Sequence, residues 1–156
     1  MVFEREIRGI RIMLRIDGYR DPSEIGYGDV WCDCAYSFRF GDVLRYEAEH
    51  EELFMPQEVD ELEEALTGLL DGTLTEAAEI APTEPDFVFT LYPEEDLRED
   101  PSCVFVDPGH EIRDVRVEWR IFFWNDGLTD NYLTITLERE DAAAFRDFLS
   151  GCRKQG

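Results

Sequence analysis

The sequence predicts an α+β fold, with a mainly antiparallel sheet of about six to seven strands and two packed helices. Segments in which apolar and polar residues alternate outnumber segments with helical spacing. Most neighbouring segments are joined by short turns, as is typical of antiparallel strands. Two segments, at about 56–71 and about 140–150, carry an apolar stripe of helical period. The 156 residues suffice for one core, so we expect a single domain over residues 1–156.

The first quarter of the chain predicts strands and a hairpin. Residues 10–16 alternate between apolar and polar side chains, which indicates a half-buried strand. Glycines and a proline in residues 18–28 indicate a loop. A long strand is expected at residues 29–40. The Gly41-Asp42 turn then leads into a partner strand at residues 43–48.

Residues 56–71 form the clearest helix. Pro56 suits the first helical position, where no backbone N–H is needed. Gly72 suits the left-handed residue that follows a helix. The apolar stripe consists of Val59, Leu62, Leu66, Leu69 and Leu70. The opposite face carries Asp60, Glu61, Glu64 and Asp71.

The middle of the chain is harder to assign. Residues 73–85 are ambiguous and end in a linker with two prolines. Residues 87–92 form a short strand, and residues 93–101 form an acidic loop. Residues 103–106 are expected to be another strand, closed by the Pro108-Gly109 turn.

A second hairpin is predicted at residues 113–124 and 131–138, because Asn125-Asp126-Gly127 is a strong turn signal. Phe122 and Trp124 point away from the buried face of their strand, so this strand is expected to be central or covered. The closing helix, at about 140–150, buries a stripe of Phe145, Phe148 and Leu149.

Negative charge is concentrated in the middle of the chain. The formal net charge is −22, from 37 acidic and 15 basic residues. Residues 47–112 hold 21 acids and one base, Arg98, which is a net −20; each flanking segment holds 8 acids and 7 bases, a net −1. Nucleic acids and anionic membranes are not expected as ligands, because both are bound through Lys and Arg.

The acid can be interpreted as a solvated, solubilising face or as a docking surface for a basic protein. The predicted 56–71 helix has no base at all, although exposed helices usually gain about 0.2–0.5 kcal/mol from each Glu–Lys pair four residues apart. A docking surface would accelerate association and make it sensitive to salt. This interpretation assigns partner binding to Glu49, Glu51, Glu52, Asp60, Glu61, Glu64, Asp71, Glu94, Glu95, Asp96, Glu99 and Asp100.

The sequence holds no motif that indicates catalysis, and we expect no catalytic residue, metal or cofactor. Phosphate loops, dinucleotide fingerprints and nucleophile elbows are absent. His50 and His110 are interpreted as solvated loop residues. The cysteines are interpreted as buried core thiols, with a metal or redox site at Cys32-Asp33-Cys34 as the alternative. The chain lacks an export signal and a membrane span, so a cytoplasmic protein is expected.

The order of the elements resembles a known family. Strands with a Trp precede an acidic-faced helix that ends Leu69-Leu70-Asp71-Gly72. A strand at Pro85–Phe89, a long aromatic strand and a helix ending at Phe145–Leu149 follow. Over roughly residues 8–150 this pattern resembles the WapI-type immunity proteins of bacterial polymorphic toxin systems. The resemblance implies an inhibitor that binds a cognate toxin, commonly a nuclease, and blocks its basic active site; it assigns no individual residue.

The primary hypothesis is a non-catalytic acidic binding protein, an immunity-type inhibitor that docks on a basic toxin or nuclease domain. One alternative is a small enzyme or ligand-binding protein that uses the loops at 18–28 and 107–112, with His110 facing carboxylates. Another is an acidic scaffold or dimerisation protein that uses the strand at Trp119–Trp124. The identity of the partner and the oligomeric state are left open by the sequence.

Overall fold

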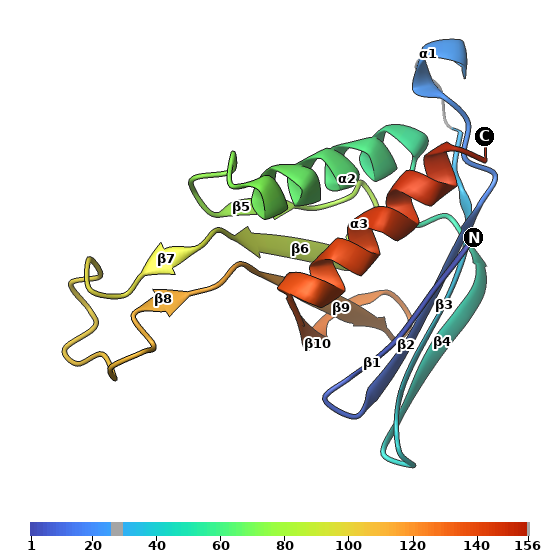
Figure 1. Ribbon diagram of the computed structural model, residues 1–156. Helices are drawn as coiled ribbons and strands as arrows, with labels where there is room; N and C mark the ends of the chain where they lie inside the picture. Colours follow the sequence, from blue (N-terminus) through green and yellow to red (C-terminus); the bar gives the residue numbers. More distant parts are fainter. Residues whose placement is uncertain (26–29, 156) are drawn as a thin grey trace.

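The computed structural model describes residues 1–25 and 30–155 (Figure 1). Within these residues the chain forms two four-stranded antiparallel sheets, a two-stranded ribbon, two long helices and one helical turn. The predicted α+β class and the two packed helices are confirmed, and the strands divide between two sheets. Positions 26–29, which include the end of the predicted 18–28 loop and the start of the predicted 29–40 strand, lie outside the described residues.

The N-terminal sheet is a simple meander in which each strand pairs with the next along the chain. Its strands are β1 (Val2–Ile7), β2 (Ile10–Asp17), β3 (Asp33–Phe40) and β4 (Leu44–Glu51). A single helical turn, α1 (Pro22–Ile25), lies between β2 and β3. The predicted strands at 10–16 and 43–48 correspond to β2 and β4, whereas β1 was not predicted.

The C-terminal sheet has the order β10-β9-β6-β5, so β9 is a central strand, as expected from its two apolar faces. Its strands are β5 (Ala78–Ile80), β6 (Phe87–Tyr92), β9 (Arg116–Trp124) and β10 (Leu128–Glu138). The predicted hairpin is therefore confirmed as β9–β10. The ambiguous segment at 73–85 supplies the short edge strand β5.

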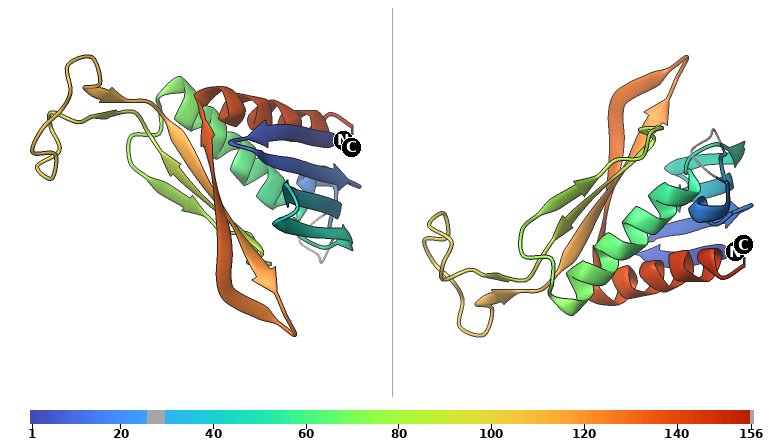
Figure 2. Two further views of the ribbon diagram at one scale, coloured as in Figure 1. Left: turned by 90° about the horizontal axis from the view of Figure 1, so that it is seen from below. Right: turned by 90° about the horizontal axis from the view of Figure 1, so that it is seen from above.

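The two long helices lie side by side over one face of the C-terminal sheet, and α3 also contacts β1 of the N-terminal sheet (Figure 2). These helices are α2 (Pro56–Asp71) and α3 (Arg139–Arg153). The bounds of α2 match the prediction, and Gly72 adopts the left-handed conformation with φ 81°. No helix in the described residues is long and apolar enough to cross a membrane.

The inner faces of both sheets and both helices share one hydrophobic core. Trp119 of β9 lies at its centre and is completely buried. Four aromatic rings lie with their centroids 5.2–5.4 Å from that of Trp119: Phe38, Phe87, Phe89 and Phe145. These rings come from β3, β6 and α3, so a single side chain joins both sheets to the closing helix.

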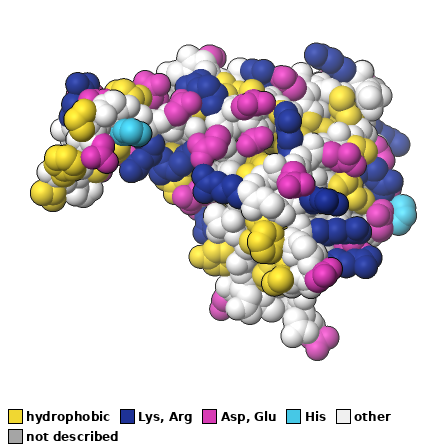
Figure 3. Space-filling view, turned by 60° about the horizontal axis from the view of Figure 1, so that its bottom comes forward, with side chains coloured by type: hydrophobic (Ala, Val, Ile, Leu, Met, Phe, Trp, Pro, Cys, Tyr) yellow, Lys and Arg dark blue, Asp and Glu magenta, His cyan; other side chains and the backbone are white. Residues whose placement is uncertain are grey.

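Between β6 and β9 the chain leaves the C-terminal sheet, and we call residues 93–115 the excursion (Figure 1). Its base is a ribbon of β7 (Glu95–Asp96) and β8 (Ile112–Arg113). The predicted strand at residues 103–106 is wrong, because this segment forms the end of the excursion and has no strand to pair with among the described residues. Val104 and Phe105 are 98% and 77% exposed there, and apolar side chains gather at this end in Figure 3.

Candidate partner-binding surface

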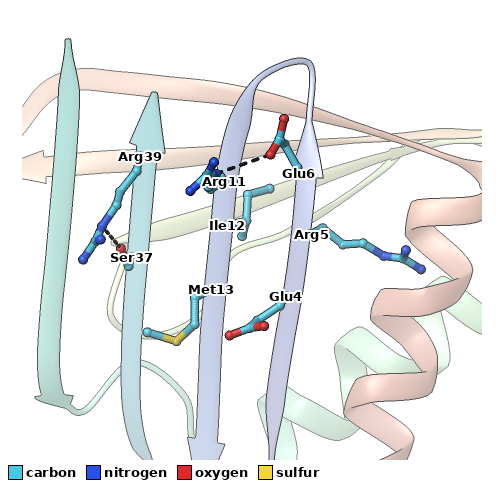
Figure 4. Close-up of a pocket in the computed structure, with 8 residues that line it drawn as sticks. All are labelled: Glu4, Arg5, Glu6, Arg11, Ile12, Met13, Ser37 and Arg39. Carbon is cyan, nitrogen blue, oxygen red and sulfur yellow. Dashed lines mark hydrogen bonds and ion pairs between the residues drawn. The ribbon is translucent and has the colours of Figure 1, made fainter. Parts of the chain in front are cut away.

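The outer face of the N-terminal sheet carries many arginines, seen as dark blue side chains at the right of Figure 3, but their charges are largely balanced within the sheet. A hollow of about 540 Å³ on this face is shown in Figure 4. There Arg11 donates to Glu6 at 3.4 Å, and Arg39 donates to Ser37 at 3.1 Å (Figure 4).

Acids of β4 neutralise further arginines of this sheet. Arg39 and Arg45 bond to Glu47 and lower the pKa of that carboxyl to about 2. The predicted site residue Glu49 pairs with Arg15 at 3.4 Å.

The acidic face of α2 is partly neutralised by the neighbouring helix. Arg153 of α3 lies 2.9 Å from Asp60 and 2.7 Å from Glu63, so α3 supplies the base that the sequence of α2 lacks. Asp60 also accepts a hydrogen bond of 2.8 Å from the Tyr19 hydroxyl. Burial, and to a lesser extent this hydrogen bond, raise the pKa of Tyr19 to about 12. Asp60 is therefore a structural ion-pair partner. Glu61 and Glu64 are exposed, and neither has an ion-pair partner among the described residues.

Five of the predicted acids converge at the base of the excursion, where the structure forms an acidic hollow of about 510 Å³. Its carboxylates are Glu76, Glu94, Glu95, Asp96, Glu99 and Asp100. Half of them have bases nearby: Asp96 pairs with Arg98 at 2.5 Å, Glu95 with Arg113 at 3.2 Å, and Glu94 lies 4.0 Å from Arg139.

The other carboxylates of the acidic hollow have no ion-pair partner within residues 1–25 and 30–155. These are Glu76, Glu99 and Asp100. Asp100 instead accepts hydrogen bonds from the backbone N–H and hydroxyl of Ser102, which lower its pKa. The predicted residue Asp71 lies beside this region at the end of α2, where it accepts two hydrogen bonds from Thr73 at 2.8–2.9 Å. The hollow is thus a region of incompletely balanced negative charge.

A second concave surface lies where β4 meets the end of β9, and we call it the acidic–aromatic groove. It encloses about 490 Å³, within the range of ~300–1,000 Å³ that is usual for ligand pockets. Its carboxylates come from Glu47, Glu51, Glu52, Glu84 and Asp86. Its aromatic side chains come from Tyr36, Tyr46 and Trp124.

A hydrogen-bond network fixes the aromatic wall of the groove. The Tyr36 hydroxyl donates to that of Tyr46 at 3.2 Å, and the Tyr46 hydroxyl lies 3.3 Å from both the carbonyl of Phe122 and the backbone nitrogen of Trp124. The indole N–H of Trp124 donates to the carboxylate of Asp86. Because these contacts join β3, β4 and β9, the groove is held by both sheets.

The charge of the groove is not balanced from within. Glu47 is held by two arginines, but Glu51, Glu52, Glu84 and Asp86 have no ion-pair partner in the described part of the chain. Asp86 is only 7% exposed, and burial raises its pKa because an ionised carboxylate loses hydration there. A cation in the groove would offset this cost.

Nine of the twelve predicted docking residues fall in three places: two in the acidic–aromatic groove, two on the exposed face of α2 and five in the acidic hollow. The other three, Glu49, Asp60 and Asp71, are held by partners within the chain. Sequence reasoning placed Glu51 and Glu52 in the docking set but missed Glu84, Asp86 and Trp124. The Glu84-Pro85-Asp86 segment has the composition of a linker. It is far from β4 in the sequence, so the sequence does not indicate that the two segments line the same groove. The available signal in the sequence was the apolar side chain of Trp124 on the second face of its strand, next to a turn. In the structure β9 is central, and Trp124 is 49% exposed at its end.

The histidines do not face these carboxylate clusters. His110 is exposed in a turn of the excursion, and His50 lies 3.1 Å from Asp33 on the rim of β4. Among the described residues, no group of three or more His, Cys, Asp or Glu side chains is arranged to hold a metal ion.

We expect one fast-reacting thiol per chain in the native protein. Cys32, Cys34 and Cys152 are buried, and burial raises their pKa values to about 12, 12 and 11, whereas Cys103 is half-buried. Since the thiolate is the reactive form, Cys103 should react first with a disulfide reagent. All four thiols should react after unfolding in guanidinium, and Cys103→Ser should abolish the fast phase. Two or more fast thiols in the folded wild type would contradict this burial.

Comparison with known proteins gives one match of nearly full length. The model of the immunity protein WapI-like family matches residues 3–155. No curated protein matches the chain.

Proposed function

This chain belongs to the immunity protein WapI-like family, and on that premise we propose that it is a non-catalytic inhibitor that binds a basic toxin domain. The inhibitor acts in the cytoplasm, where it covers the toxin's active site. Recognition uses the acidic surfaces of this chain, and neither a cofactor nor catalysis by this chain is needed.

The observation that supports this proposal most directly is the distribution of unbalanced carboxylates. They gather in two hollows, the acidic hollow and the acidic–aromatic groove, while the arginines of the N-terminal sheet are engaged by neighbouring acids. Toxin active sites that act on nucleic acid need positive charge to hold phosphate. Complementary negative charge accelerates association with such a site and excludes uncharged competitors.

The proposal is tested by growth. Expression of a basic toxin-domain gene adjacent to the gene for this chain is expected to arrest growth, and co-expression of this chain is expected to restore it. A neighbouring gene that is harmless alone, or arrest that persists when this chain is present, would contradict the proposal.

A double substitution examines the role of the acidic hollow. Glu76→Gln with Glu99→Gln is expected to slow association with the toxin by about tenfold at low salt, because two unpaired charges are lost from the surface that attracts it. The difference should shrink at high salt, where the charges are screened. Association rates measured by stopped-flow or surface plasmon resonance report this directly.

The matched control is Glu4→Gln with Glu24→Gln, which removes the same charge from exposed positions on β1 and α1. Equal slowing by the two double variants would mean that only net charge matters, and it would remove the acidic hollow from the binding surface.

A further inference from the structure

We propose that the acidic–aromatic groove receives an arginine side chain of the partner and is the anchor point of the interface. This inference rests on the proposed function and assigns a position and a chemistry to the contact. It is carried by the composition of the groove, by the lack of an internal cation there, and by the uncovered sheet face next to it.

The groove offers the groups that a guanidinium needs. Glu84 and Asp86 lie two residues apart on one wall, and Glu51 and Glu52 lie on the wall formed by β4. A guanidinium donates five N–H groups in a planar fork, so it can bond to two carboxylates at once. Asp86 is preorganised for this role, because the indole N–H of Trp124 fixes its carboxylate.

Arginine fits the groove better than lysine. Arg is more weakly hydrated than Lys and loses less on entering a partly buried site, and its flat guanidinium stacks on aromatic rings. Tyr36, Tyr46 and Trp124 form the wall against which it would lie. A lysine ammonium would keep a point charge but would use neither the fork geometry nor the stacking surface.

A similar group of an arginine, an aromatic ring and a carboxylate occurs at another place in this fold. On the outer face of the C-terminal sheet, the guanidinium of Arg116 lies 4.1 Å from the ring centroid of Tyr92. The hydroxyl of Tyr92 donates to Glu118 at 3.3 Å, so an arginine, an aromatic ring and a carboxylate are grouped there. In the acidic–aromatic groove the ring and the carboxylates are present, and none of the residues that line it is a base.

The surface beside the groove is suited to the rest of an interface. Both long helices cover the inner face of the C-terminal sheet, and in the described residues no helix covers its outer face (Figures 1 and 2). Near the β9–β10 turn this uncovered face exposes Trp124, Leu128 and Tyr132, by 49%, 41% and 50%. Trp, Tyr and Arg are the residues most enriched at the energetic centres of protein interfaces. A partner that inserts an arginine into the groove would also bury these side chains.

The test uses the folded protein and a small probe, so it needs no toxin. The probe is a capped Gly-Arg-Gly peptide, titrated at physiological salt into the isotope-labelled protein. The reporter is the indole N–H resonance of Trp124, one of three tryptophans in the chain. A saturable shift of this resonance is expected with the arginine peptide, while the resonance of the buried Trp119 stays in place. A matching peptide with citrulline, which is neutral and of the same shape, should not shift Trp124.

Variants that each remove one negative charge distinguish binding in the groove from non-specific attraction of the peptide to an acidic protein. Asp86→Asn is expected to weaken binding of the arginine peptide by about tenfold, and Glu84→Gln by several-fold. Glu4→Gln removes the same charge from an exposed position on β1, outside the groove, and should leave binding unchanged. If Asp86→Asn fails to fold, Glu84→Gln and Glu52→Gln carry the comparison.

Equal binding of the citrulline peptide, an unmoved Trp124 resonance, or equal weakening by the Glu4 and groove variants would overturn the inference. Its failure is distinguishable from that of the proposed function. Growth rescue by a chain that does not bind the peptide would refute only the groove, whereas peptide binding without growth rescue would refute only the inhibitor role.

Discussion

Replacing Trp119 with alanine is expected to lower the free energy of unfolding by about 3–5 kcal/mol, the usual cost of removing a large aromatic side chain from a core. Trp119 is completely buried, and rings from β3, β6 and α3 surround it. The substitution therefore opens a cavity where both sheets meet the closing helix. Urea unfolding followed by circular dichroism would measure the loss as a lower midpoint with an unchanged slope.

Trp119→Phe is the matched control, and its cost should be less than half that of alanine. The indole N–H of Trp119 is buried and has no hydrogen-bond partner among the described residues, so phenylalanine removes no hydrogen bond to another part of the protein. Phenylalanine removes this group and keeps a ring against Phe87 and Phe145. Equal destabilisation by alanine and phenylalanine would mean that a ring at this position contributes no packing energy, and it would contradict the aromatic contacts described for Trp119.

Glu58→Ala is expected to lower the free energy of unfolding by about 2–3 kcal/mol, because it removes a buried acceptor that serves three donors. Glu58 is 8% exposed and accepts hydrogen bonds from the backbone N–H of Met55 at 2.8 Å and of Thr83 at 2.6 Å. It also accepts one from the Thr83 hydroxyl at 2.7 Å. The side chain thus caps the start of α2 and fastens to it the segment that leads into β6.

Hydrogen exchange gives this prediction a local readout. In Glu58→Ala the amide of Thr83 should lose protection along with the overall loss of stability measured in urea. The control Glu61→Ala lies on the exposed face of the same helix and should change stability by no more than about 0.5 kcal/mol. A Glu58 variant as stable as the Glu61 variant would mean that the three hydrogen bonds contribute nothing net.

Much of the fold could be predicted because several segments carry strong local signals. The α2 helix has a proline at its start, a glycine after its end and an apolar stripe between them, and the structure places its bounds at Pro56–Asp71. The β1 strand has no comparable signal. Only Phe3 and Ile7 are buried in it, and Arg5 on the same face lies 4.0 Å from Asp141 of α3. Its strand conformation depends on pairing with β2, which local sequence does not encode.

The candidate site was only partly predictable for the same reason. The concentration of acid could be read from composition, but which acids remain unbalanced depends on arginines far away in the chain. Arg153 neutralises Asp60 from a distance of 93 positions, and no local pattern around α2 reveals that pair. Conversely, Asp86 lies in a linker-like segment, and only the pairing of β6 with β9 brings it to Trp124.

The contact between β1 and α3 has a consequence for the timing of the proposed inhibition. Phe3 packs against Phe145 and Phe148, with ring centroids 5.1 and 5.8 Å apart, so the buried face of β1 is covered only once the closing helix is present. A ribosome synthesises the chain from the N-terminus, and β1 must wait until some 140 further residues have been made. The proposed inhibition would therefore require a chain translated through α3, and a product truncated before α3 is expected not to bind the toxin.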